Sequence, residues 1–124
     1  TLTNTSNALF GVESYSASVR DARANARGRG TFLEGDVARV VKSQEMHVDA
    51  IILDPPRTGC TPETVDALAS CGASRIVYVS CDPATLARDV ARFREHGYAL
   101  VEAQPVDMFP QTRHIECVAL FLKR

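Results

Sequence analysis

The stretch Arg75-Ile-Val-Tyr-Val-Ser-Cys-Asp-Pro-Ala-Thr-Leu-Ala-Arg-Asp89 changes from a strand pattern to a helix pattern within a few residues. Its segment Ile76–Val79 is β-branched and aromatic, which is typical of a buried strand. Pro83 then suits the first position of a helix, and apolar residues recur on one helical face up to about His96. A buried strand that leads directly into a helix predicts a βα unit of an α/β domain.

The same alternation runs through the rest of the chain. The expected strands are Ala8–Glu13, Thr31–Leu33, Val48–Leu53, Arg75–Val79, Tyr98–Glu102 and Glu116–Leu122. The expected helices run from Ser14 or Ser16 to about Ala26, from Thr58 or Thr61 to about Gly72 and from Pro83 to about His96, with a helical turn or short helix at Val37–Val41. Val106–Pro110 is expected to be a loop, because prolines at 105 and 110 bracket it. The alternation predicts an α/β sandwich with a mostly parallel sheet, whose last two strands are antiparallel because their connection is too short for a crossover helix.

The composition fits a single folded domain spanning residues 1–124. Of its residues 45% are hydrophobic and 23% are charged, which excludes a disordered tail. The formal net charge is -1, from 14 Lys+Arg against 15 Asp+Glu, which excludes phosphate binding driven by bulk charge but not a local basic patch. No apolar stretch approaches the roughly 20 residues that span a bilayer, and no signal segment opens the chain.

The four cysteines indicate a reducing compartment. Cys60, Cys71, Cys81 and Cys117 form no Cys-x-x-Cys pair and no cluster with metal-ligand spacing. A chain of this length buries a core without disulfides. We therefore interpret all four as reduced thiols of a cytoplasmic protein, with no metal site, and Cys71 as a buried small residue of a helix.

Polar or reactive side chains follow four of the expected strands. They are Glu13, Asp36, Asp54 with the following Pro-Pro-Arg57, and Ser80-Cys-Asp-Pro83. Ligands of open α/β sheets bind outside the carboxyl ends of the strands, so these residues predict a site. A carboxylate such as Glu13 can accept hydrogen bonds from both hydroxyls of a ribose, which indicates a nucleoside cofactor.

Five segments of the chain resemble the uracil-5 RNA methyltransferases, which use S-adenosylmethionine. The segments are Gly11-Val-Glu13, Ala22-Arg-Ala-Asn-Ala26, Leu53-Asp-Pro-Pro-Arg-Thr-Gly59, Val77-Tyr-Val-Ser-Cys-Asp-Pro-Ala-Thr-Leu-Ala-Arg-Asp89 and Asp107-Met-Phe-Pro-Gln-Thr-Arg-His-Ile-Glu116. They cover the chain from about Ala8 to its end. The resemblance implies a Rossmann-like class I methyltransferase, a three-layer sandwich, that acts on tRNA or rRNA as its RNA partner.

The resemblance also implies two catalytic residues. Cys81 matches the family's nucleophile, and Glu116 matches the acid that serves as general base. The chemistry needs both types, because a thiolate adding to carbon 6 of uracil makes carbon 5 nucleophilic, and a base must then remove the carbon 5 proton. Cys81 stands just before an expected helix N-terminus, which favours the thiolate. The family has Asn where this chain has Asp82, and that carboxylate opposes thiolate formation unless it is engaged elsewhere.

Three acids match cofactor-binding positions of the family. Glu13 corresponds to the acid that holds the cofactor ribose, and Asp36 to a position beside the adenine. Asp54 corresponds to the acid near the methionine end of S-adenosylmethionine and the target base. The alternative for Glu13 and Asp36 is an ordinary loop acid, and for Asp54 it is a turn acid.

Other interpretations stay open from the sequence. Asp-Pro-Pro also occurs in methyltransferases that act on exocyclic amines, although those place an aromatic residue where this chain has Arg57. Arg57, Arg88 and Arg113 are candidates for contacts with RNA phosphates, but a single arginine is more often the partner of a salt bridge within the protein. A further alternative is a non-catalytic module that binds cofactor or RNA weakly or not at all.

The family's first strand and glycine-rich loop are expected before Gly11. Only Thr1–Asn7 precede the first apolar strand, so no room is left for either of them. We therefore expect residues 1–124 to be the C-terminal part of a methyltransferase catalytic domain. Such a chain is expected to bind S-adenosylmethionine poorly and not to methylate RNA by itself.

Overall fold

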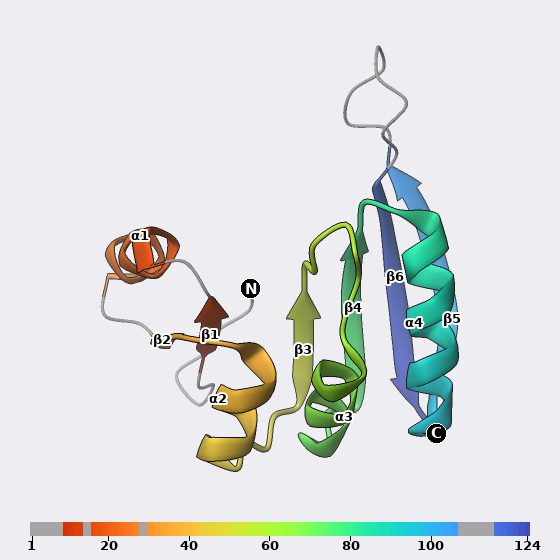
Figure 1. The fold of residues 1–124 in the computed structure, drawn as a ribbon, viewed down its shortest axis with the longest axis horizontal. Helices are drawn as coiled ribbons and strands as arrows, with labels where there is room; N and C mark the ends of the chain where they lie inside the picture. The colour runs from red at the N-terminus through yellow and green to blue at the C-terminus, as the bar shows by residue number, and fades with distance from the viewer. Residues whose placement is uncertain (1–8, 14–15, 28–29, 107–115) are drawn as a thin grey trace. The chain divides into compact units, whose positions relative to one another are not determined.

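A computed structural model describes residues 9–13, 16–27, 30–106 and 116–124 (Figure 1). The chain divides into two compact units, residues 1–44 and residues 45–124. We describe each unit by itself.

The first unit is a βαβα segment. Its elements are β1 (Phe10–Glu13), α1 (Ser16–Ala26), β2 (Thr31–Glu34) and α2 (Val37–Gln44). The two strands are parallel, in a register that pairs Phe10 with Thr31 and Glu13 with Glu34. Val19 of α1 and Val41 of α2 are buried, as the amphipathic pattern of each helix requires. α2 is a full helix, longer than the short segment expected from the sequence.

The second unit has a four-stranded mixed sheet. Its elements are β3 (Ala50–Leu53), α3 (Pro62–Ser70), β4 (Arg75–Ser80), α4 (Pro83–Glu95), β5 (Tyr98–Val106) and β6 (Glu116–Lys123). The strand order is β3-β4-β6-β5, with β3 and β4 parallel and β6 antiparallel to both of its neighbours. The predicted α/β class and the antiparallel C-terminal strand are therefore confirmed.

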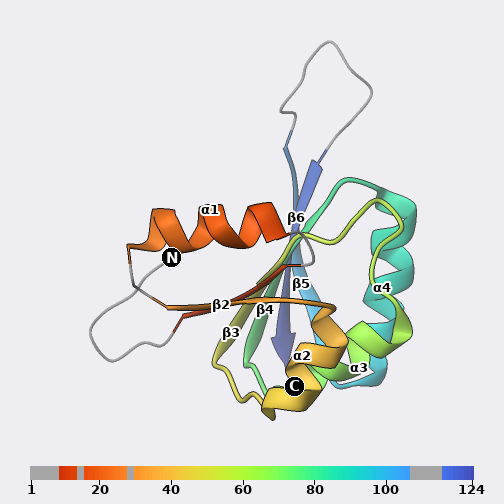
Figure 2. The same ribbon diagram turned by 60° about the vertical axis from the view of Figure 1, so that its left-hand side comes forward.

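The two helices of this unit cover one face of its sheet (Figure 2). Alternate residues of β4, Ile76, Tyr78 and Ser80, are buried, while those between them are not. Phe93 of α4 packs against Phe121 of β6, with ring centroids 5.1 Å apart. This period-two burial is what a strand with one helix-covered face requires.

β5 is longer than the sequence predicted. We expected a loop to begin at Val106, but Val106 is the last residue of β5 and pairs with Glu116. Pro105 fits this strand because β5 lies at the edge of the sheet, and proline within sheets is confined largely to edge strands. The remainder of the expected loop lies outside the described residues.

β3 is shorter than the expected strand and begins at Ala50. The backbone N–H of Val48, which we had placed in the strand, donates to the carbonyl of Cys71 instead. No helix in the described part of the chain is long and apolar enough to cross a membrane.

Candidate active site at the carboxyl ends of β3 and β4

The two predicted catalytic residues lie at the same end of the β4–β6 ladder. The last pair of this ladder joins Ser80 to Cys117. Cys81 directly follows the first of these residues, and Glu116, the first residue of β6, directly precedes the second, so both lie at this end of the two strands. Both are half-buried. The topology thus brings together a thiol and a carboxyl group that are far apart in sequence.

Asp54 lies at the same edge of this sheet. β3 runs parallel to β4, and the register pairs Leu53 with Tyr78. Asp54 follows β3 directly and is exposed. Three of the five predicted site residues therefore share one edge, at the carboxyl ends of the parallel strands, where ligands of α/β sheets bind.

The other two predicted site residues belong to the first unit and lie close to each other. Glu13 ends β1, and its carbonyl accepts the N–H of Gly35 at 2.9 Å. Asp36 follows at once, and its Oδ2 accepts the backbone N–H of Arg39 at 3.1 Å. Asp36 therefore caps α2, a local role that leaves its other carboxylate oxygen for a ligand.

The turn between β4 and α4 holds Cys81 between two fixed residues. Ser80 is buried, and its Oγ donates to the carbonyl of Asp82 at 2.9 Å and accepts the N–H of Asp82 at 3.1 Å. The Asp82 side chain accepts the N–H of Ala84 at 2.9 Å and is the N-cap of α4. The carboxylate that we expected to disfavour a thiolate at Cys81 is thus engaged at the helix N-terminus.

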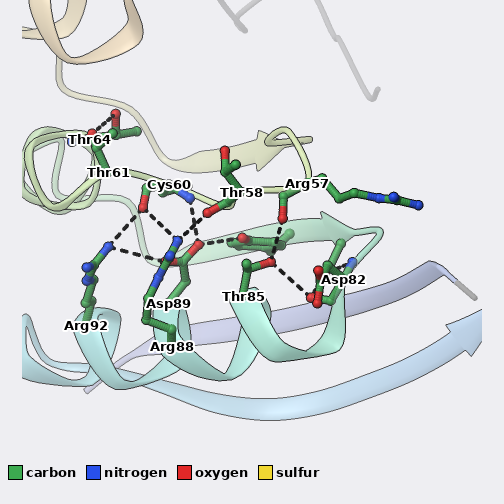
Figure 3. A network of polar contacts seen from close by, with 12 residues as sticks. Arg57, Thr58, Cys60, Thr61, Thr64, Asp82, Thr85, Arg88, Asp89 and Arg92 are labelled. Atoms are coloured by element: carbon green, nitrogen blue, oxygen red, sulfur yellow. Dashed lines mark hydrogen bonds and ion pairs between the residues drawn. The ribbon is translucent and has the colours of Figure 1, made fainter.

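A network of polar contacts joins α4 to the loop after β3 (Figure 3). Asp89 of α4 is fully buried, and its Oδ2 accepts the N–H of Cys60 at 2.8 Å and the hydroxyl of Tyr78 at 2.6 Å. Its Oδ1 lies 3.3 Å from Nη2 of Arg88 and 3.7 Å from Nη1 of Arg92. The negative charge of this carboxylate is therefore balanced by two guanidinium groups.

The same helix also binds the backbone of the loop. Arg88 Nη2 donates to the carbonyls of Thr58 at 2.5 Å and Cys60 at 3.2 Å, and Arg92 Nη1 donates to that of Cys60 at 2.9 Å. Thr85 Oγ1 lies 3.1 Å from the carbonyl oxygen of Arg57. Side chains of α4 thus fix the loop that connects Asp54 to α3.

The sequence interpretation missed Asp89. It expected apolar residues on one face of this helix, and Leu86 and Phe93 are indeed buried while Val90 is half-buried. Asp89 falls within this apolar stripe, three residues after Leu86, so an acid on a buried helical face was a signal that could have found it.

The structure gives different environments to two of the three arginines that the sequence offered as RNA-binding candidates. Arg88 forms the internal salt bridge that was one of its two interpretations. The Arg57 side chain points away from the network in Figure 3. Arg113 lies outside the described residues.

The four cysteines are free thiols in two different environments. Cys60 and Cys71 are buried, whereas Cys81 and Cys117 are half-buried. Burial, with the adjacent Asp89 carboxylate, raises the pKa of Cys60 from 9.0 to about 12, and burial also raises the pKa of Cys71. The buried position of Cys71 that the sequence predicted is confirmed. Neither buried thiol is suited to act as a nucleophile at neutral pH.

Solved structures show the class of fold. An N-methyltransferase, NodS from Bradyrhizobium japonicum, superposes with a TM-score of 0.75 at 14% identity, covering 94% of this chain and 66% of that one. At this identity the likeness concerns the fold alone, which is that of the class I methyltransferases.

The sequence pattern described as tRNA (Uracil-5-)-methyltransferase matches residues 6–124, and the chain belongs to this family. An RNA methyltransferase of Gloeobacter violaceus is 47% identical over 122 residues, covering 95% of this chain and 26% of the relative. The tRNA (uracil-54, C5)-methyltransferase of Pyrococcus abyssi, solved with S-adenosyl-L-homocysteine, has a TM-score of 0.81 and 33% identity, covering 94% of this chain and 29% of that one. The chain spans about a quarter of the length of the curated relatives it matches.

Proposed function

We propose that the protein transfers a methyl group from S-adenosylmethionine to carbon 5 of a uridine in RNA, and that residues 1–124 form part of its catalytic domain. The observation that carries this proposal is the position of Cys81 and Glu116 across the end of the β4–β6 ladder. Membership in the family supports it, as does the Pyrococcus abyssi relative, which acts on uracil 54 of tRNA.

In the proposed mechanism Cys81 and Glu116 act in turn on one uracil ring. The Cys81 thiolate forms a bond to carbon 6, and the electron pair of the 5,6 double bond moves into an enolate that makes carbon 5 nucleophilic. Carbon 5 then takes the methyl group, and Glu116 accepts the proton that carbon 5 still carries. Restoring the double bond expels the Cys81 thiolate.

S-adenosylmethionine, when bound, supplies the methyl group from a positively charged sulfonium, and the electron pair of the broken bond stays on the sulfur of the departing S-adenosylhomocysteine. The carboxylates at the strand ends fit such a ligand, because ribose hydroxyls donate and carboxylates accept. We propose that Glu13 binds the ribose, that Asp36 lies beside the adenine, and that Asp54 binds near the methionine end and the target base. The S-adenosyl-L-homocysteine found with the Pyrococcus abyssi relative supports this choice of cofactor.

Substituting the nucleophile in the full-length protein tests the mechanism. Cys81→Ala should abolish methylation and also the covalent adduct with RNA that contains 5-fluorouridine. Cys117→Ala is the matched control, because Cys117 is also a half-buried thiol and lies beside Glu116. A Cys81→Ala protein that still methylates uridine would overturn the thiolate mechanism.

Glu116→Gln tests the second half of the mechanism. The adduct should form but fail to release, so covalent protein–RNA should accumulate with ordinary uridine RNA. A variant that turns over at the wild-type rate, or that forms no adduct at all, would contradict the role of Glu116 as the base.

We further propose that residues 1–124 expressed alone bind S-adenosylmethionine poorly and do not methylate RNA. Calorimetric titration of S-adenosylmethionine into this chain measures the affinity. Micromolar binding would contradict the proposal.

A further inference from the structure

We propose that Asp89 is a positioning residue for this reaction: its buried carboxylate fixes the loop that begins at Asp54 against the helix that begins after Cys81. The proposal rests on the proposed function, because it concerns the relative placement of two residues of that site. Asp89 is fully buried, so the role proposed for it is exerted through the residues that it contacts.

One carboxylate ties together three elements of the second unit. Asp89 belongs to α4, Tyr78 to β4, and Cys60 to the loop after β3, and both of these partners donate to the same oxygen, Oδ2. Among the described residues, no buried side-chain nitrogen or oxygen lacks a hydrogen-bond partner. The network is therefore fully satisfied, which is the condition under which buried polar groups specify one arrangement.

Burying a carboxylate is a costly way to attach a helix to a sheet. Apolar packing provides that attachment without desolvating charges, and Phe93 already packs α4 against β6. What apolar packing does not provide is a defined position for the backbone of a loop. Asp89, Arg88 and Arg92 supply it through hydrogen bonds to the N–H and carbonyl of Cys60 and the carbonyl of Thr58.

The loop backbone lies so close to α4 at Gly59 that there is no room for a side chain. Gly59 has a φ of +76°, and a Cβ added there would lie 2.5 Å from Nη2 of Arg88 and 2.7 Å from Oδ2 of Asp89. Only glycine fits this approach without a shift of the network. The contact is thus built from both sides, with glycine in the loop and the charged groups in the helix.

The same helix also fixes the Cys81 end of the site. Thr85 Oγ1 lies 3.1 Å from the carbonyl oxygens of both Arg57 and Asp82, so it links the loop to the turn that holds Cys81 (Figure 3). If the loop shifts relative to α4, the separation of Asp54 and Cys81 changes. A shift of about 1 Å in such a constellation can cost 100-fold in rate.

The test uses Asp89→Asn in the full-length protein, with Asp66→Asn as the matched control. Asp66 is an acid on α3 whose side chain is 60% exposed and pairs with His96. The measurements are kcat and KM for RNA and S-adenosylmethionine, the rate of adduct formation with 5-fluorouridine RNA, and hydrogen exchange of residues 57–60. All are made well below the unfolding temperature and are referred to folded protein.

Asp89→Asn should lower kcat and the adduct rate by about 10- to 100-fold and speed exchange of the Cys60 amide, with KM values changed far less. Asp66→Asn should stay within about twofold of wild type, as exposed substitutions usually do. Faster exchange in Asp89→Asn with unchanged kcat would overturn the positioning role and leave only a structural one. If Asp89→Asn does not fold, Tyr78→Phe is the second test, because it removes only the hydroxyl that donates to Asp89. Tyr78→Phe should lower kcat about 3- to 10-fold, and a wild-type kcat would refute the proposal.

These outcomes are separate from a failure of the proposed function. A failure of the proposed function would appear as methylation by the full-length protein that survives Cys81→Ala. The exchange measurement on the loop is independent of any chemistry at uracil.

Discussion

Replacing Gly59 by alanine should destabilise the loop after β3 far more than the same change at Gly72. Both glycines have a positive φ, +76° at Gly59 and +72° at Gly72. A Cβ at Gly72 would meet nothing within 4 Å, whereas one at Gly59 would meet Arg88 and Asp89. The pair therefore separates the cost of the backbone conformation from the cost of the contact with α4.

The magnitude follows from this difference. Alanine in the left-handed region costs about 1–2 kcal/mol, and both variants lose this amount. In Gly59→Ala the Oδ2 of Asp89 must also move, although it accepts from Cys60 N–H and the Tyr78 hydroxyl. Leaving one such buried group without its partner costs about 1–3 kcal/mol. Gly59→Ala should thus exceed Gly72→Ala by about 1–3 kcal/mol, which is about 5- to 150-fold in an opening equilibrium.

Hydrogen exchange of the full-length protein measures the opening equilibrium of this loop directly. The amide of Cys60 is protected by its bond to Asp89, so its exchange reports on opening of the loop. Gly59→Ala should speed that exchange by at least the factor given above, because the backbone cost at Gly59 adds to the cost of the contact, while Gly72→Ala should leave it near wild type. Equal exchange of the Cys60 amide in the two variants would refute the reasoning that the loop is held by close approach to α4.

Three further predictions concern the thiols and the cap of α4. At pH 8 a small alkylating reagent should modify Cys81 in the folded protein before Cys60 or Cys71, as peptide mapping after brief labelling would show; labelling of Cys60 at the same rate would contradict its burial. Asp82→Asn should keep the N-cap and leave stability near wild type, whereas Asp82→Ala should cost about 0.5–2 kcal/mol of stability, measured by urea unfolding. Folding raises the pKa of Cys60 from 9.0 to about 12, so its contribution to the free energy of unfolding is complete below pH 9 and is lost as the pH rises towards 12. The urea midpoints measured at pH 8 and pH 11 should therefore differ less in Cys60→Ala than in the wild-type protein.

The elements that were predicted from the sequence have local causes. Thr61 caps α3 by accepting the N–H of Thr64, with Pro62 at the first helical position, and both features are visible in the sequence. β4 was recognised because four β-branched or aromatic residues follow one another. Patterns of this kind depend on residues a few positions apart, and a single sequence contains them in full.

The features that were missed depend on residues far apart in the chain. The two groups that donate to Oδ2 of Asp89 belong to Tyr78 and Cys60, which lie 11 and 29 residues away, so the local pattern shows an acid on an apolar helical face but not what satisfies it. The length of β5 depends on its place at the edge of the sheet, which makes Pro105 acceptable and which follows only from the insertion of β6 next to β4. The position of Cys81 opposite Glu116 has the same origin, since it requires the register of that insertion.

The environment of the four thiols argues for Cys81 as the nucleophile independently of the family motif. A nucleophilic cysteine must be reachable and must ionise near neutral pH. Cys60 and Cys71 fail on both grounds, because they are buried and burial raises the pKa of each thiol. Cys117 is half-buried but lies within β6, where it is paired with both Ser80 and Pro105. Cys81 alone among the four directly follows a strand and directly precedes the N-cap of a helix, whereas Cys60, which precedes the N-cap of α3, is buried at the end of a loop. The fold therefore favours Cys81 as the thiol for the proposed covalent catalysis.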